Sequence, residues 1–104
     1  MNKPLFIFDS PTQNSINQIR FDPASKARHK LKLMEICKPY VEQNLPFLTR
    51  ARLKDHRLVA DFVDINMKYI IEIADTETEQ SLKHKEHLWR SLGYSYEVVR
   101  VWMI

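Results

Sequence analysis

Two short apolar runs on either side of a tight turn place the strongest constraint on how this chain folds. The runs cover residues 58–65 and 69–74, and residues 66–68 lie between them. Runs of this length, rich in β-branched and aromatic residues and separated by a turn, predict a β-hairpin. The second run is apolar almost throughout, which is typical of a strand covered on both faces. We therefore expect the hairpin inside a sheet that has a layer on each side.

Each strand of this hairpin carries an acid, Asp61 in the first and Glu72 in the second. Because side chains alternate along a strand, Ala60 and Phe62 should share one face and Asp61 should lie on the other. If the strands pair in register, Asp61 and Glu72 reach the same face and can hold one divalent ion between them. A carboxylate in an apolar strand is costly unless a metal, a cation or hydrogen bonds stabilise it. The alternative is a pair of solvated acids on an uncovered face.

The flanking segments contain further signals. Asp22-Pro23 predicts the start of a helix that ends before Pro39. Residues 40–49 predict a strand. We expect an N-terminal arm over residues 1–21, with a short strand at 5–8, and one domain over 22–104.

A second helix is expected over residues 79–92, with Thr76 or Thr78 as its N-cap. Leu82, Trp89 and Leu92 form the stripe of this helix that should be buried. Gly93 is the single glycine of the chain, and it falls where a left-handed C-terminal cap is favoured. Residues 95–102 predict the last strand, which should run parallel to the second hairpin strand because a helix connects the two.

The acid pattern resembles the signature of the PD-(D/E)XK nuclease superfamily. The residues that carry the resemblance are Ala60-Asp61-Phe62 and Glu72-Ile73-Ala74. The order of the later segments is similar to the very-short-patch-repair-like branch, through Ile71-Glu72-Ile73, the helix, Gly93-Tyr94 and the strand that ends in Arg100-Val101-Trp102. The resemblance covers residues 25–103. It implies an α/β fold, a small restriction-endonuclease-like αβββαβ sandwich with a mixed sheet flanked by helices.

The resemblance also implies an activity, that of a metal-dependent DNA endonuclease of the mobile-element, phage or repair type. Asp61 and Glu72 would hold Mg²⁺ or Mn²⁺, which suit hard oxygen ligands. The ion would activate water and stabilise charge on the scissile phosphate. A chain of 104 residues has little surface for DNA, so we expect a homodimer or a subunit of a larger nucleoprotein complex.

The chain departs from the superfamily pattern at the lysine, because Ala74 stands where the lysine after the second acid belongs. Relatives sometimes supply this lysine from the following helix. Lys85 lies three residues after Leu82, on the inward stripe, and is the third expected catalytic residue with Asp61 and Glu72. Alternatively, Lys85 extends along the edge of the core with its ammonium in water. The missing lysine also favours a second function, a catalytically degenerate protein that acts as a DNA- or protein-binding module.

A second departure lies in the first helix, where the superfamily usually carries an acid. This chain has Lys26, Arg28 and His29 near that position. Glu35 lies seven residues after Arg28, on about the same helix face, and is the expected substitute. A solvated acid without a role in the site is the alternative.

Charge is mildly in favour of a nucleic-acid partner. The chain has 16 Lys and Arg residues against 13 Asp and Glu residues, a net charge of +3. This balance permits nucleic-acid binding without requiring it. The expected phosphate contacts lie in two basic clusters and are Arg28, Lys30, Arg50, Arg52, Lys54 and Arg57. An ordinary charged surface is the alternative for each of them.

The remaining composition narrows the setting. No apolar run approaches the ~20 residues that span a bilayer, so no membrane association is expected. Cys37 is the single cysteine and cannot form a disulfide within the chain. A reducing, cytoplasmic location is therefore expected.

Overall fold

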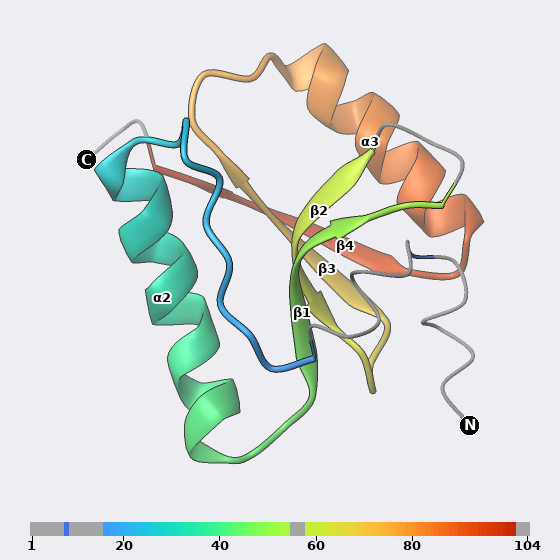
Figure 1. Ribbon diagram of the computed structural model, residues 1–104. Helices are drawn as coiled ribbons and strands as arrows, with labels where there is room; N and C mark the ends of the chain where they lie inside the picture. Colours follow the sequence, from blue (N-terminus) through green and yellow to red (C-terminus); the bar gives the residue numbers. More distant parts are fainter. Residues whose placement is uncertain (1–7, 9–15, 55–57, 102–104) are drawn as a thin grey trace.

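The computed structural model describes residue 8, residues 16–54 and residues 58–101. Its elements follow the order α2 (Ala27–Glu42), β1 (Phe47–Arg52), β2 (Val59–Asp64), β3 (Tyr69–Ala74), α3 (Glu79–Ser91) and β4 (Ser95–Arg100). Figure 1 shows α2 on one side of the sheet and α3 on the other. The predicted α/β class and the αβββαβ order are confirmed.

The four strands form one mixed sheet in the order β1-β2-β3-β4. β1, β2 and β3 pair antiparallel, and β3 pairs with β4 in parallel after the chain crosses through α3. The predicted hairpin and the parallel last strand are thus confirmed. Phe62 lies opposite Ile71. Because β2 and β3 are antiparallel, Asp61, which precedes Phe62, and Glu72, which follows Ile71, lie on the same side of this residue pair.

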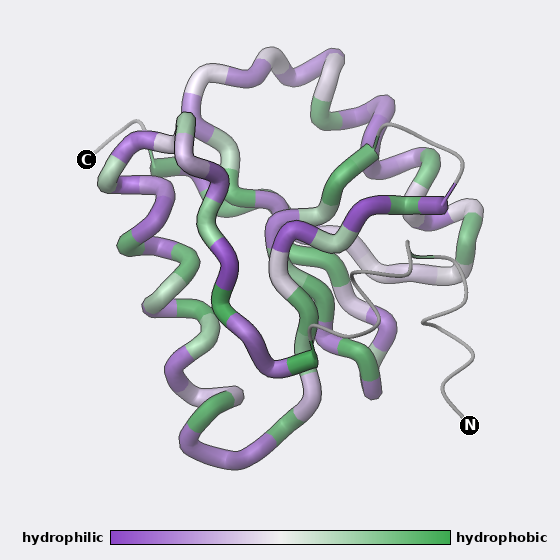
Figure 2. The backbone as a smooth tube through the Cα atoms, viewed as in Figure 1, coloured by the Kyte–Doolittle hydropathy of each residue, from purple (hydrophilic) through white to green (hydrophobic). Residues whose placement is uncertain are grey.

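A hydrophobic core lies on each face of the sheet. On the α2 side, Leu33 and Cys37 pack against Phe62, Ile71 and Ile73. On the α3 side, the packed residues include Trp89, Val63, Ile70, Ala60, Leu48 and Tyr96. Figure 2 shows the hydrophobic colour concentrated in the strands between the two helices. Two covered faces explain why the second hairpin run is almost continuously apolar.

The alternation of side chains breaks at Asp61. Ala60 packs on the α3 side and Phe62 on the α2 side, so the prediction that they share a face is wrong. Across the strand pair, the ladder between β1 and β2 skips Arg50, which has φ +49° in the left-handed region. At this point the Asp61 Oδ2 atom accepts a hydrogen bond of 2.8 Å from the Ile73 backbone N–H. The Asp61 carboxylate therefore accepts the hydrogen bond that a backbone carbonyl of β2 would normally accept from β3.

The bounds of α2 differ from the prediction at both ends. Asp22 closes a turn instead of starting the helix, because its Oδ1 accepts from the Ala24 N–H at 3.0 Å and its carbonyl from the Ser25 N–H at 2.9 Å. The helix begins at Ala27 and continues through Pro39 to Glu42. Consequently, the predicted strand over 40–49 is wrong over residues 40–46, because β1 begins only at Phe47.

Contacts of Tyr40 explain why α2 continues past Pro39. The Tyr40 hydroxyl donates to Asp64 Oδ2 at 2.7 Å, and its ring centroid lies 4.8 Å from that of Phe62. Pro39 removes one helical hydrogen bond. Packing of the following turn against β2 offsets that loss, as is usual for helices held by tertiary contacts.

The second helix follows the prediction closely. Thr78 is its N-cap, with Oγ1 accepting from the Ser81 N–H at 3.1 Å, and Gly93 adopts φ +88° just after its end. Leu82 and Trp89 are buried as predicted, whereas Leu92 is 39% exposed. The burial of Leu92 was predicted wrongly because the helix ends at Ser91.

Part of the predicted N-terminal arm lies against the sheet. Phe8 is buried next to Trp89 and bridges Leu53, while residues 5–7 of the predicted short strand lie outside the described residues. The Asn17 N–H donates to the Phe47 carbonyl at 2.9 Å, and the Arg20 N–H donates to Thr49 Oγ1 at 2.8 Å. These bonds bring residues 20–22 to one end of the sheet. Neither α2 nor α3 has the length and apolarity needed to cross a membrane, and these are the helices in the part of the chain that the structure describes.

Candidate functional site

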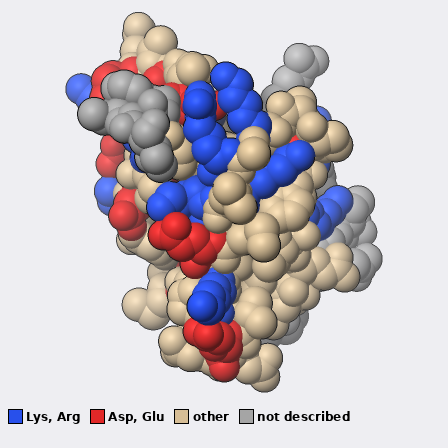
Figure 3. All heavy atoms as spheres, turned by 90° about the vertical axis from the view of Figure 1, so that its left-hand side faces the viewer, with Lys and Arg blue, Asp and Glu red and all other residues tan. Residues whose placement is uncertain are grey.

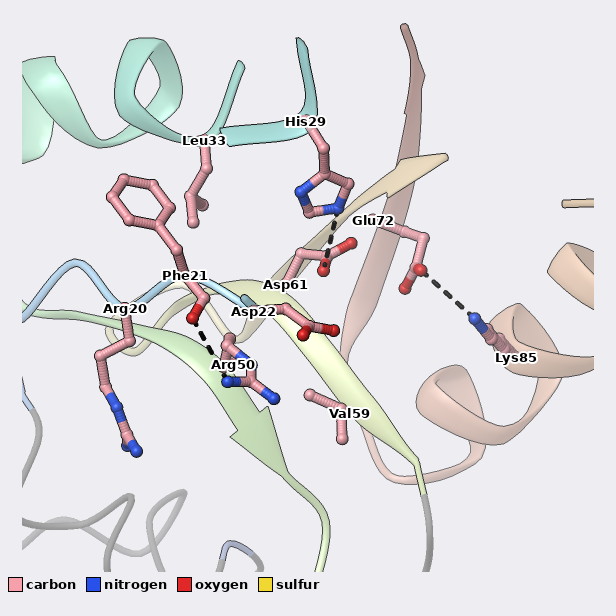
Figure 4. Close-up of a pocket in the computed structure, with 10 residues that line it drawn as sticks. All are labelled: Arg20, Phe21, Asp22, His29, Leu33, Arg50, Val59, Asp61, Glu72 and Lys85. Atoms are coloured by element: carbon pink, nitrogen blue, oxygen red, sulfur yellow. Dashed lines mark hydrogen bonds and ion pairs between the residues drawn. The ribbon is translucent and has the colours of Figure 1, made fainter. Parts of the chain in front are cut away.

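A pocket of about 210 Å³ opens at the end of the sheet where β2 and β3 carry their acids. Its walls come from residues 20–22, both helices and the first three strands (Figure 4). The lining residues are Arg20, Phe21, Asp22, His29, Leu33, Arg50, Val59, Asp61, Glu72 and Lys85. Three expected catalytic residues, Asp61, Glu72 and Lys85, therefore meet in one pocket.

Asp61 is held from two directions. Its Oδ2 accepts from the Ile73 N–H, and its Oδ1 lies 3.5 Å from His29 Nε2 on α2. The hydrogen bond to Asp61 raises the pKa of His29 above its usual value, against the opposing effect of burial. Both side chains are 18% exposed. This arrangement favours the protonated imidazole of His29.

Glu72 is the most unusual group in the pocket, since it is only 4% exposed and its carboxylate is directed towards Lys85 of α3 (Figure 4). Burial and the charge of Asp61 raise the Glu72 pKa to about 8, with Lys85 acting in the opposite direction. Within the described chain, the Oε1 atom of Glu72 has no hydrogen-bond partner. A buried carboxylate oxygen without a partner costs free energy, so this atom favours a proton or an added cation.

Lys85 reaches the pocket from α3. Its Nζ lies 3.3 Å from Glu72 Oε2 and 2.5 Å from Glu77 Oε2. Burial lowers the Lys85 pKa, but the hydrogen bond that Lys85 donates to Glu77 and the charge of Glu72 outweigh this effect, and the net shift is upward. Lys85 is therefore a charged donor at neutral pH and not a free base. Glu77 gave no signal in the sequence, because it lies in the loop before α3 and has no periodic pattern.

The structure does not bring Glu35, the expected substitute for the helix acid, into the pocket. Glu35 lies on the outer side of α2, where its side chain is 71% exposed and contacts Lys32 Nζ at 3.1 Å. His29 occupies the inward position instead. It precedes buried Leu33 by four residues, and Leu33 precedes buried Cys37 by four, so this spacing could have identified His29 as a pocket residue.

The expected phosphate-binding residues divide into several environments. Arg50 lines the pocket and donates to the Phe21 carbonyl at 3.4 Å, and Arg28 pairs with Asp75 Oδ1 at 2.6 Å. Lys30 is half-buried on α2, Arg52 and Lys54 are exposed, and Arg57 lies outside the described residues. Arg20 joins Arg50 in the pocket lining although it was not among the expected contacts.

The molecular surface adds a broader feature. Figure 3 shows Lys and Arg side chains gathered over one half of the face that carries α2, with acidic groups interspersed among them. A mixed surface of this kind contains enough positive charge to contact phosphates, but it is not a uniform basic field.

The oxygen ligands available to a metal are few. Among the residues that the structure describes, no three His, Cys, Asp or Glu side chains form a metal-binding group. Asp61 and Glu72 remain as two carboxylates at one pocket, and Mg²⁺ often binds to one or two protein carboxylates and retains several waters. Comparison with protein-family models, curated proteins and solved structures finds no significant match for this chain.

Proposed function

We propose that this protein is a metal-dependent endonuclease that hydrolyses phosphodiester bonds in DNA, with Asp61, Glu72 and Lys85 as its catalytic residues. The observation that carries the proposal is the buried Glu72 carboxylate, whose Oε1 atom has no partner beside a second acid and a lysine. The proposal also draws on the resemblance of the acid pattern to the PD-(D/E)XK superfamily and its restriction-endonuclease-like fold.

The donor set fits Mg²⁺ or Mn²⁺. Hard carboxylate oxygens of Asp61 and Glu72 suit these ions, and a cation would compensate the unpaired Oε1 atom. Such an ion supplies Lewis-acid stabilisation of the phosphate and lowers the pKa of a bound water. Burial and the charge of Asp61 raise the pKa of Glu72, and a bound cation would stabilise the charged form of this carboxylate.

The surrounding residues have distinct roles. Lys85 keeps its proton and directs its ammonium to the phosphate oxygens or to the attacking water, while Glu77 orients it from the solvent side. The His29 imidazole and the Ile73 N–H hold the Asp61 carboxylate in place. Arg20 and Arg50 contact the phosphates that flank the scissile bond.

A second candidate function is a catalytically degenerate nuclease-fold protein that binds DNA or another protein. Two observations favour it specifically. His29 already compensates Asp61, and Lys85 already compensates Glu72 and Glu77, so the two acids have built-in cations. The absence of lysine at Ala74 supports the same reading.

The setting of the proposed enzyme follows from its partners. DNA is the substrate, and a homodimer or a larger nucleoprotein complex supplies the surface that 104 residues lack. We place the activity in the cytoplasm, in a mobile-element, phage or repair context. Cys37 is buried, and burial raises the pKa of its thiol to about 12, so this thiol is expected to be unreactive.

The decisive experiment is cleavage of supercoiled and branched DNA with Mg²⁺ or Mn²⁺. We expect metal-dependent cutting by the wild type and its loss in Glu72→Gln and in Lys85→Ala. Glu79→Gln is the matched control, because this acid lies on α3 with a 75% exposed side chain outside the pocket. If the wild type binds DNA in a salt-sensitive way but does not cut it, the endonuclease proposal is rejected in favour of the binding module.

A further inference from the structure

The outer side of α2 carries a second apolar surface that the sheet does not cover. Leu31, Met34 and Val41 are 63%, 50% and 57% exposed, whereas Leu33 and Cys37 on the inner side are buried. With Ile19 these three residues line an open groove of about 640 Å³. We call residues Leu31, Met34, Lys38 and Val41 the outer stripe. An apolar surface of this kind on a small domain is typical of an interaction site.

The charges at the outer stripe restrict what can occupy it. Glu35 and Glu42 border the groove, and Lys38 lies within the stripe itself. Within the described chain, no ion pair joins Lys38 or Glu42 to another side chain. Two acids at an apolar groove disfavour nucleic acid and anionic membranes. The suitable occupant is an apolar surface that offers one cation and acids of its own.

The outer stripe has the same spacing in both directions along the helix. Its residues are separated by three, four and three positions, which is also the spacing of a coiled-coil seam. In an antiparallel pair of α2 helices, Leu31 faces Val41 of the second copy and Met34 faces Lys38 of the second copy. The stripe is therefore complementary to itself.

We propose that the outer stripe of α2 is the contact through which two copies of this chain form an antiparallel dimer. The aliphatic stem of Lys38 covers Met34 of the second copy, and its ammonium reaches Glu35 there. Glu35 is accessible for this contact, because its side chain is 71% exposed even with Lys32 beside it. The dimer leaves the pocket open, since His29 and Leu33 lie on the inner side of the helix.

The expected affinity is modest. α2 has 16 residues, so the contact is about 24 Å long at 1.5 Å per residue. One helix pair of this length falls at or below the low end of specific interfaces, about 1,200 Å² in total. We therefore expect a dissociation constant on the order of micromolar.

Sedimentation of the full chain over a concentration series tests the proposal. We expect a reversible monomer–dimer equilibrium for the wild type and a monomer for Met34→Glu at the same concentrations. Met67→Glu is the matched control, because Met67 is 73% exposed in the hairpin turn, and it should dimerise like the wild type. Circular dichroism checks that each variant is folded. A wild type that stays monomeric up to about 1 mM, or a dimer that Met34→Glu leaves intact, would overturn the proposal.

Cross-linking tests the register and the identity of the occupant. A mixture of Leu31→Cys and Val41→Cys chains should form a disulfide between copies under oxidation, and neither variant alone should do so efficiently. Cys37 does not interfere because it is buried. Cross-linking of each variant with itself would reject the antiparallel register. These measurements need neither metal nor DNA, so their failure is independent of failure of the proposed nuclease activity.

Discussion

Replacement of Glu72 by Gln should stabilise the metal-free protein at neutral and alkaline pH. Burial, together with the charge of Asp61, raises the pKa of Glu72 to about 8. Above this pH the folded chain must hold a charged carboxylate that is 4% exposed and has one unpaired oxygen. Gln has nearly the same shape without the charge, so it removes the cost of that burial.

The sign and size of the effect follow from the pKa displacement. The unfolded chain releases the Glu72 proton near its ordinary value of 4.5, whereas the folded chain keeps it until about 8. The free energy of unfolding of the wild type therefore falls as pH rises across this window. The full displacement corresponds to roughly 4–5 kcal/mol at about 1.36 kcal/mol per pKa unit. Relaxation of the site and loss of the Lys85 contact reduce the expected gain of Glu72→Gln to about 2 kcal/mol at about pH 9, with little difference below about pH 5.

Denaturant unfolding in the presence of a chelator measures this difference. Wild type, Glu72→Gln and Glu79→Gln are compared at several pH values, and the last variant controls for loss of an exposed acid on the surface. The wild-type and Glu79→Gln curves should fall together from acidic to alkaline pH, while Glu72→Gln should be flatter. Parallel curves for wild type and Glu72→Gln would show that the buried carboxylate is not perturbed, and the main support for the site would be lost.

Three further outcomes are expected. Millimolar Mg²⁺ or Mn²⁺ should raise the thermal midpoint of the wild type and leave that of Glu72→Gln unchanged, because a ligand stabilises only the state that binds it; equal shifts in both would place the ion elsewhere. Asp61→Ala should lower the free energy of unfolding by about 1–3 kcal/mol in chemical denaturation, since the Ile73 N–H loses its acceptor; no loss would mean that water or another group replaces it. Gly93→Ala should lower the free energy of unfolding by about 1 kcal/mol. Backbone strain at φ +88° is the whole cause, because nothing lies within 4 Å of an added Cβ. An unchanged denaturation midpoint would contradict that conformation.

Local sequence signals were sufficient for the hairpin and for α3. The turn at 66–68, the Thr78 cap and Gly93 each act over a few residues, so the local sequence is enough to predict them. The bounds of α2 could not be found in the same way. Asp22 and Pro39 are strong local signals for a helix start and a helix end, but the contacts of Tyr40 with β2 extend the helix past the proline.

The candidate site was predictable only in part, for a similar reason. The meeting of Asp61 with Glu72 follows from strand pairing, and the inward position of Lys85 follows from helical spacing. The irregularity at Arg50 has no sequence signature, because left-handed φ values of non-glycine residues depend on the surrounding structure. The contact of Glu77 with Lys85 could not be predicted either, because Glu77 lies in a loop and only the folded position of α3 places Lys85 beside it.

The competition between built-in cations and a metal ion separates the two proposed functions. Each acid has a cation from a helix on a different face of the sheet, His29 from α2 for Asp61 and Lys85 from α3 for Glu72. A divalent ion must compete with both contacts, and its binding should strengthen as His29 loses its proton with rising pH. Glu77 would ease this competition, because it pairs with Lys85 and would hold the ammonium if Glu72 bound the ion. A nuclease therefore requires that the ion outweigh His29 at Asp61, whereas a binding module requires only that the two helices remain held to the sheet by these contacts.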